Sequence, residues 1–139
     1  MRYLLFVSHG ALAAGMTQAL GMLVGEREDV RQVAFQDGMG LPAFKAEVEK
    51  VLIPMTAEDE IIILADLVSG SPLTTTMAAI SEKPGLQNVR AIGGMNLPMA
   101  VTAIEEEDSP LDDTVSAMMA CAAGQVKQFS TDADSEDEI

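Results

Sequence analysis

Cysteine and histidine are almost absent from this chain of 139 residues, which contains one of each. The single cysteine, Cys121, cannot form a disulfide within the chain, and one histidine with one cysteine cannot build the usual kind of Cys/His zinc site. We therefore expect no metal centre. The GxxxxGK[ST] loop that holds ATP phosphates is also missing, and we expect no bound cofactor.

Basic residues are scarce. Eight Lys and Arg stand against 22 Asp and Glu, and the formal net charge is −14. Nucleic acids and anionic membrane surfaces are polyanions, so we expect no nucleic-acid partner. Five of the acidic residues lie in residues 130–139, which contain no base. This pattern predicts a disordered acidic tail behind one domain over residues 1–129.

Long hydrophobic runs are missing as well. No apolar stretch reaches the roughly 18 residues that a membrane-spanning helix needs. The apolar N-terminal segment, residues 3–7, is soon interrupted by His9 and Gly10, which predicts a buried strand rather than a signal peptide. We expect a cytoplasmic protein.

The rest of the chain alternates between short apolar runs and segments of helical period. Glycine or proline separates most of them, and Ser71 followed by Pro72 is a good helix start, with Ser71 as N-cap. The alternation predicts an α/β fold with a mainly parallel central sheet and helices on both faces. The predicted elements are strands over residues 3–7, 30–35, 61–65, 89–92 and 126–129, and helices over 12–24, from 42, from 71, from 98 and over 111–123.

Two polar residues stand where predicted strands end. His9 follows the first strand, and Asp66 follows the most strongly β-branched one. Parallel strands lie about 4.8 Å apart and end at one edge of the sheet, so the two side chains can touch. A carboxylate on one ring nitrogen fixes the tautomer and leaves the other nitrogen as a nucleophile. The plainer interpretation is a structural histidine and a turn-forming aspartate, and the sequence leaves both open.

The segment Ser69-Gly70-Ser71 follows Asp66 and opens a predicted helix. Free backbone N–H groups at a helix N-terminus, with a serine hydroxyl, form a weak anion site. A nucleophilic histidine beside an anion site predicts a phosphohistidine carrier. A signalling receiver domain phosphorylated on Asp66 is disfavoured, because the first strand ends without the acidic residues that hold magnesium.

Three segments resemble the IIA component of a mannose-family sugar phosphotransferase system. They are Phe6-Val7-Ser8-His9-Gly10, the stretch from Leu64 to Pro72 with its Gly-Ser-Pro, and Gly93-Gly94-Met95-Asn96-Leu97-Pro98-Met99. The three occur in the family's order and intervals over most of residues 1–129. The chain differs at Val68-Ser69, where many members have Trp-Gly or Leu-Gly, so its loop has one glycine fewer.

The resemblance implies a phosphohistidine at His9, with Asp66 bonded to Nδ1 and with Ser71 and the Gly70 backbone in contact with the phosphoryl group. At the position where the chain differs from the family, we expect Ser69 to add a further donor to the phosphate-binding loop. It implies a phosphoryl donor, the phosphocarrier HPr, and an acceptor, a separate IIB component that serves the IIC/IID membrane pair. The protein would then be cytoplasmic, or peripheral at the membrane through those partners. It also implies a homodimer in which a C-terminal strand, here residues 125–130, is exchanged.

Two other functions remain open at this stage. A dihydroxyacetone kinase system uses a related phosphohistidine domain, similar to this chain around His9 and Asp66. The Gly70-Ser71-Pro72 and Asn96-Leu97-Pro98 segments favour the mannose-type carrier. The second alternative is a small-ligand module of the same fold, in which His9 is only structural.

Overall fold

The computed structural model describes residues 1–131. Four strands alternate with helices, as the sequence pattern predicts, and two consecutive helices close the order. Each predicted strand of the body and each predicted helix is present, with ends that differ by at most two residues from the prediction. The elements are β1 (Arg2–His9), α1 (Leu12–Val24), β2 (Val30–Phe35), α2 (Leu41–Leu52), β3 (Glu60–Ala65), α3 (Ser71–Glu82), β4 (Asn88–Ile92), α4 (Leu97–Glu105) and α5 (Leu111–Gln125).

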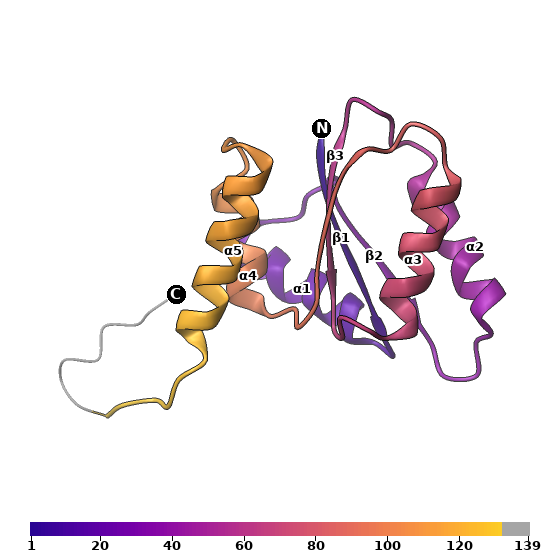
Figure 1. The fold of residues 1–139 in the computed structure, drawn as a ribbon. Helices are drawn as coiled ribbons and strands as arrows, with labels where there is room; N and C mark the ends of the chain where they lie inside the picture. Colours follow the sequence, from indigo (N-terminus) through magenta and orange to yellow (C-terminus); the bar gives the residue numbers. More distant parts are fainter. Residues whose placement is uncertain (132–139) are drawn as a thin grey trace.

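The four strands form one sheet in the order β2-β1-β3-β4, and all three pairings are parallel. The predicted α/β fold is therefore confirmed. Val7 pairs with Ala65 on β3, so the residues that follow these two positions emerge side by side. Every strand ends at the same edge, which lies at the bottom of the sheet in Figure 1.

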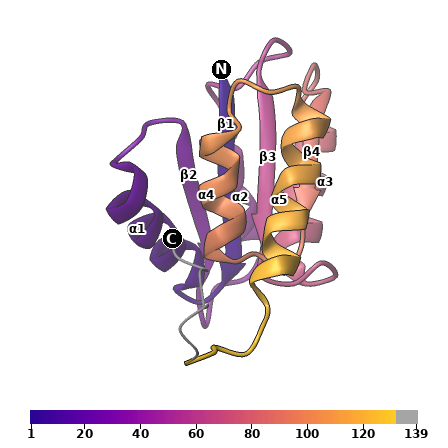
Figure 2. The ribbon, with the colours of Figure 1, turned by 90° about the vertical axis from the view of Figure 1, so that its left-hand side faces the viewer.

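Helices cover both faces of the sheet. Side chains of β1 alternate between two cores, because successive residues of a strand point to opposite faces. Leu5 packs in the core under α2 and α3, whereas Phe6 packs in the core under α1, α4 and α5, and neither is exposed. Figures 1 and 2 show this three-layer arrangement, with α2 and α3 on one side of the sheet and the other helices opposite.

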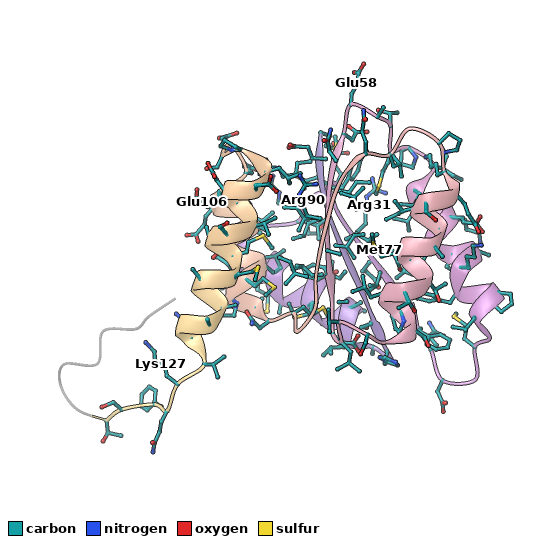
Figure 3. All side chains as sticks on the ribbon, viewed as in Figure 1. Arg31, Glu58, Met77, Arg90, Glu106 and Lys127 are labelled. Atoms are coloured by element: carbon teal, nitrogen blue, oxygen red, sulfur yellow. The ribbon has the colours of Figure 1, made fainter. Side chains whose placement is uncertain are left out.

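The C-terminal part differs from the prediction in two ways. The last helix continues through Gly124 to Gln125, since no positive φ interrupts it there. The predicted strand over residues 126–129 is absent: residues 126–131 form neither helix nor strand. A strand needs a partner to receive its backbone hydrogen bonds, and this segment leaves the end of α5 with Val126 and Phe129 largely exposed. Figure 3 shows Lys127 on it, far from α3.

The acidic tail predicted over residues 130–139 falls, from residue 132 on, outside the described residues. The domain boundary at residue 129 stays a prediction. Among residues 1–131, no helix combines the length and the apolar character needed to cross a membrane.

Candidate functional site

His9 is the last residue of β1 and stands at the carboxyl edge of the sheet. The chain turns sharply at Gly10, whose φ of 56° favours glycine and whose N–H donates to the Phe35 carbonyl at the end of β2. The buried hydroxyl of Ser8 accepts a hydrogen bond of 2.7 Å from the Ala13 N–H in the first turn of α1. These contacts fix the backbone on both sides of His9.

The imidazole itself is open to solvent. Its side chain is 47% exposed, and the neighbouring ring of Phe35 lies tilted against it with 6.2 Å between centroids. A ring with this much exposed surface can be reached by a second macromolecule.

Asp66 follows β3 directly and holds His9 in two ways. Its Oδ2 accepts from the Nδ1 of His9 at 2.8 Å and from the backbone N–H of His9 at 3.0 Å. Its Oδ1 accepts from the N–H of Leu67 at 2.9 Å. The structure thus brings together the two residues that the sequence placed at adjacent strand ends.

The pKa of the Asp66 carboxyl lies below its ordinary value. Desolvation by partial burial acts in the opposite direction, but the hydrogen bonds from the backbone and ring of His9 and from the N–H of Leu67 together outweigh it. Asp66 is therefore ionised at neutral pH and can only accept hydrogen bonds. The neutral His9 ring must carry its hydrogen on Nδ1, which leaves the lone pair of Nε2 free for attack on an electrophile.

This shift predicts a dependence of stability on pH. A carboxylate whose pKa is lower in the folded state contributes stability that is present above its unfolded pKa, about 4, and lost as the pH falls through the folded value. We expect the difference in unfolding free energy between the parent and Asp66→Asn to be present at pH 5 and to shrink as the pH falls below the ordinary aspartate value of about 4. Urea unfolding at each pH measures it, with the exposed Asp37→Asn as control. A difference that grows as the pH falls below that value would contradict the assignment.

The β3–α3 loop brings the start of α3 against His9. Gly70 packs so closely that a Cβ on it would lie 2.9 Å from Cε1 of the imidazole, so only glycine fits without displacing the ring. Gly70, rather than Ser71 as predicted, is the N-cap of α3: it is extended, and its carbonyl accepts from the N–H of Thr74. Ser71 and Pro72 are the first two helical residues.

The two predicted serines have a less direct place in the site. Ser71 lies at the positive end of the α3 dipole, and Ser69 is exposed in the preceding loop. Within residues 1–131, neither hydroxyl is hydrogen-bonded to His9. Pro72 has no N–H, so the donors near the start of α3 are the backbone N–H groups beside it and the serine hydroxyls.

Within residues 1–131 there is no group of three or more His, Cys, Asp or Glu side chains that could bind a metal ion. The groups that meet at His9 are its own ring nitrogen, the Asp66 carboxylate and the uncharged donors at the start of α3. Such a set can accept an anionic, transferable group such as a phosphoryl group on Nε2.

The fold and the site define a class: a three-layer parallel α/β protein with an accessible, carboxylate-held histidine beside a helix N-terminus. The chain belongs to the EIIA-man family, described as "PTS system fructose IIA component", whose family model matches residues 3–120. It is a mannose-family IIA component of the sugar phosphotransferase system, and such components have a phosphocarrier role in sugar uptake.

Individual relatives agree with the family. The sorbose-specific EIIA component of Klebsiella pneumoniae is 29% identical over 124 residues, which cover 88% of each chain. The mannose-specific EIIAB component of Escherichia coli K12 is 26% identical over 80% of this chain but only 34% of its own length. A mannose/sorbose-specific IIA subunit from Enterococcus faecalis superimposes with a TM-score of 0.81 at 25% identity, covering 94% of this chain and 96% of that one.

Sequence reasoning missed two residues that shape the site. Ser8 is fully buried, and its hydroxyl anchors the first turn of α1. A serine at the end of an apolar strand, directly before the histidine, is the signal that could have indicated this role. Gly93, at the end of β4, lies against the loop that follows Asp66, and nothing in the local sequence points to this contact.

Proposed function

We propose that His9 accepts a phosphoryl group from phospho-HPr on Nε2 and passes it to a IIB component during phosphoenolpyruvate-dependent sugar uptake. The observation that carries the proposal is the hydrogen bond of 2.8 Å between Asp66 and Nδ1, on a ring that is otherwise accessible. It orients the free nitrogen outward, where a protein partner can present an electrophilic phosphorus. Family membership supports the same function.

The transfer follows an in-line displacement. The lone pair of Nε2 forms a bond to phosphorus while the P–N bond to the donor histidine of HPr breaks, and that histidine recovers its lone pair. The His9 ring gains positive character as the bond forms, and ionised Asp66 stabilises it through the Nδ1 hydrogen. Passage to IIB is the same displacement in reverse, with a nucleophile of IIB attacking the phosphorus.

We assign Ser69, Gly70 and Ser71 to the equatorial phosphoryl oxygens. The start of α3 supplies N–H groups and a favourable dipole, and the loop 66–71 contains no Lys or Arg to bind the group strongly. Moderate binding suits an intermediate that must be passed on. No cofactor or metal takes part in the proposed steps.

Ser71→Ala tests this assignment. Hydrogen bonds to a charged group contribute about 1.5–3 kcal/mol, so loss of one should shift the phosphoryl-transfer equilibrium with HPr toward HPr by roughly tenfold or more. The equilibrium is measured from the phosphorylated fractions of both proteins, with Ser81→Ala, a serine near the far end of α3, as control. An equilibrium equal to that of the parent would remove Ser71 from the site.

We further propose a homodimer in which residues 125–130 of each chain pair with the partner's sheet. In support, β4 is an edge strand of the described sheet, and Val126 and Phe129 expose their apolar side chains beyond α5. We expect twice the chain mass of 14.7 kDa in sedimentation equilibrium for the parent, and a lower dimer fraction for Phe129→Glu. A monomeric parent at micromolar concentration would contradict the proposal.

The partners proposed here are HPr, a separate IIB component and, through IIB, the IIC/IID membrane components. Transfer can be followed directly by incubating the chain with phosphoenolpyruvate, enzyme I and HPr, and then adding IIB. We expect the phosphoryl group to appear first on this chain and then on IIB. We place the protein in the cytoplasm, where phosphoenolpyruvate and HPr occur. A IIB component that is phosphorylated equally fast without this chain would contradict the carrier role.

A further inference from the structure

The turn between β4 and α4 lies against the loop that carries Asp66. Two backbone hydrogen bonds join them: the N–H of Gly94 donates to the Asp66 carbonyl at 3.2 Å, and the N–H of Met95 donates to the Ala65 carbonyl at 2.9 Å. The turn therefore holds the end of β3 and the first residue of the loop in place.

Gly93 makes the closest approach in this contact. A Cβ on Gly93 would lie 2.5 Å from the Cβ of Val68, 2.6 Å from its Cα and 2.7 Å from its N. Real Cβ atoms essentially never come within 3.0 Å of a heavy atom outside their own residue and its two chain neighbours. Two of the three atoms belong to the backbone, so a change of side-chain rotamer at Val68 cannot relieve the overlap.

One side of the contact is rigid and the other is not. The turn runs into α4, where the side chain of Asn96 accepts from the N–H of Met99 at 3.0 Å and Met99 is buried in the core. Val68, in contrast, is 71% exposed in its loop. A side chain at position 93 should therefore displace the loop rather than the core.

Displacement of this loop reaches the site on both sides. Val68 is two residues from Asp66, which holds Nδ1 of His9, and two residues from Gly70, which packs against Cε1 of the same ring. Both contacts depend on the path of the loop between them. Because Gly93 has no side chain, the loop can follow the path that places the Asp66 carboxylate and the start of α3 beside His9.

We propose that Gly93 is a positioning residue for phosphoryl transfer: its missing side chain lets the Asp66–Gly70 loop approach closely enough to orient His9. Gly93 acts through Val68, since the three heavy atoms nearest a Cβ at position 93 all belong to that residue. The inference rests on the proposed phosphocarrier function for its kinetic consequence, but its structural consequence stands independently of that function.

The experiment compares the parent with Gly93→Ala and with Gly124→Ala, a glycine where an added Cβ meets nothing within 4 Å. Three quantities are measured on each: the thermal unfolding midpoint, the ¹⁵N NMR shifts of the His9 ring, and the rate of phosphoryl acceptance from phospho-HPr. For Gly93→Ala we expect a midpoint within about 4 °C of the parent. The NMR shifts should show loss of the single Nδ1–H tautomer, and acceptance should be slower by about 10- to 100-fold.

Rescue distinguishes positioning from general damage. Adding Val68→Gly to Gly93→Ala removes the Cβ of residue 68 and gives its backbone more freedom, so we expect the His9 tautomer and part of the rate to return. Gly124→Ala should match the parent in the ring NMR shifts and in the acceptance rate, and its unfolding midpoint should not fall, because alanine favours the α5 helix more than glycine does.

Three results would overturn the inference. They are parent-like NMR shifts in Gly93→Ala, a parent-like acceptance rate in an active parent system, and unfolding of Gly93→Ala, which would place the strain on the core. If the parent itself accepts no phosphoryl group, the proposed function fails, and the ring NMR of Gly93→Ala still decides whether Gly93 positions His9.

Discussion

Replacing His9 by alanine is expected to abolish phosphoryl acceptance from phospho-HPr, and with it all transfer to IIB through this chain. His9 is the only histidine in the sequence, so no other imidazole can take its place as the acceptor. The imidazole is 47% exposed, so its removal creates no cavity in either core. The readout is the phosphorylated fraction of the variant after incubation with phosphoenolpyruvate, enzyme I and HPr.

Folding of His9→Ala must be measured alongside. We expect its thermal unfolding midpoint to fall only slightly, because the lost hydrogen bond to Asp66 lies at the surface. His9→Gln serves as a second variant, since its amide can still donate to Asp66 but cannot attack phosphorus. A folded His9→Ala or His9→Gln that becomes phosphorylated would show that another residue carries the group.

Asp66→Asn is expected to produce the second-largest effect. The asparagine has nearly the same shape and can still accept from the backbone N–H of His9, a bond of 3.0 Å in the parent. It carries no charge, so it neither holds the Nδ1–H tautomer as firmly nor stabilises the cationic ring. Loss of an orienting aspartate beside a reacting histidine costs about 10⁴ in rate in serine proteases, and we expect a loss on the order of 10²–10⁴ here.

The rate of acceptance from phospho-HPr, measured by rapid quench, tests this expectation. Asp37→Asn is the matched control, because Asp37 is an exposed acid in the neighbouring β2–α2 loop and changes the net charge equally. If Asp66→Asn and Asp37→Asn are both slower than the parent by the same factor, the loss of rate comes from the change in net charge alone. If both react as fast as the parent, Asp66 has no orienting role.

Local sequence information was enough to predict the main features of the fold and the centre of the site. The three β-branched residues at 61–63 and the alternation of strand and helix periods determine a parallel sheet. A parallel sheet, in turn, brings the residues after its strands to one edge. The meeting of His9 with Asp66 follows from that rule, although 57 residues separate them.

Other features depend on contacts between distant segments and could not be predicted locally. Leu12 is a large apolar residue in the first turn of α1, yet it is 52% exposed, whereas Ala13 and Leu20 of the same helix are buried. The close approach of Gly93 to Val68 depends on how two loops meet in space. The strand predicted at residues 126–129 needs an edge strand to pair with, and within the single chain this segment pairs with neither β2 nor β4.

The intact mass of the parent chain after incubation with phosphoenolpyruvate, enzyme I and HPr tests the central claim most directly. We expect one added phosphoryl group, about 80 Da, that is lost in acid and retained in alkali, as is characteristic of a phosphohistidine. Reactions that lack HPr should leave the mass unchanged. An unmodified mass with an HPr that is itself phosphorylated, or an adduct that is stable in acid, would contradict the account of His9 as the phosphoryl carrier.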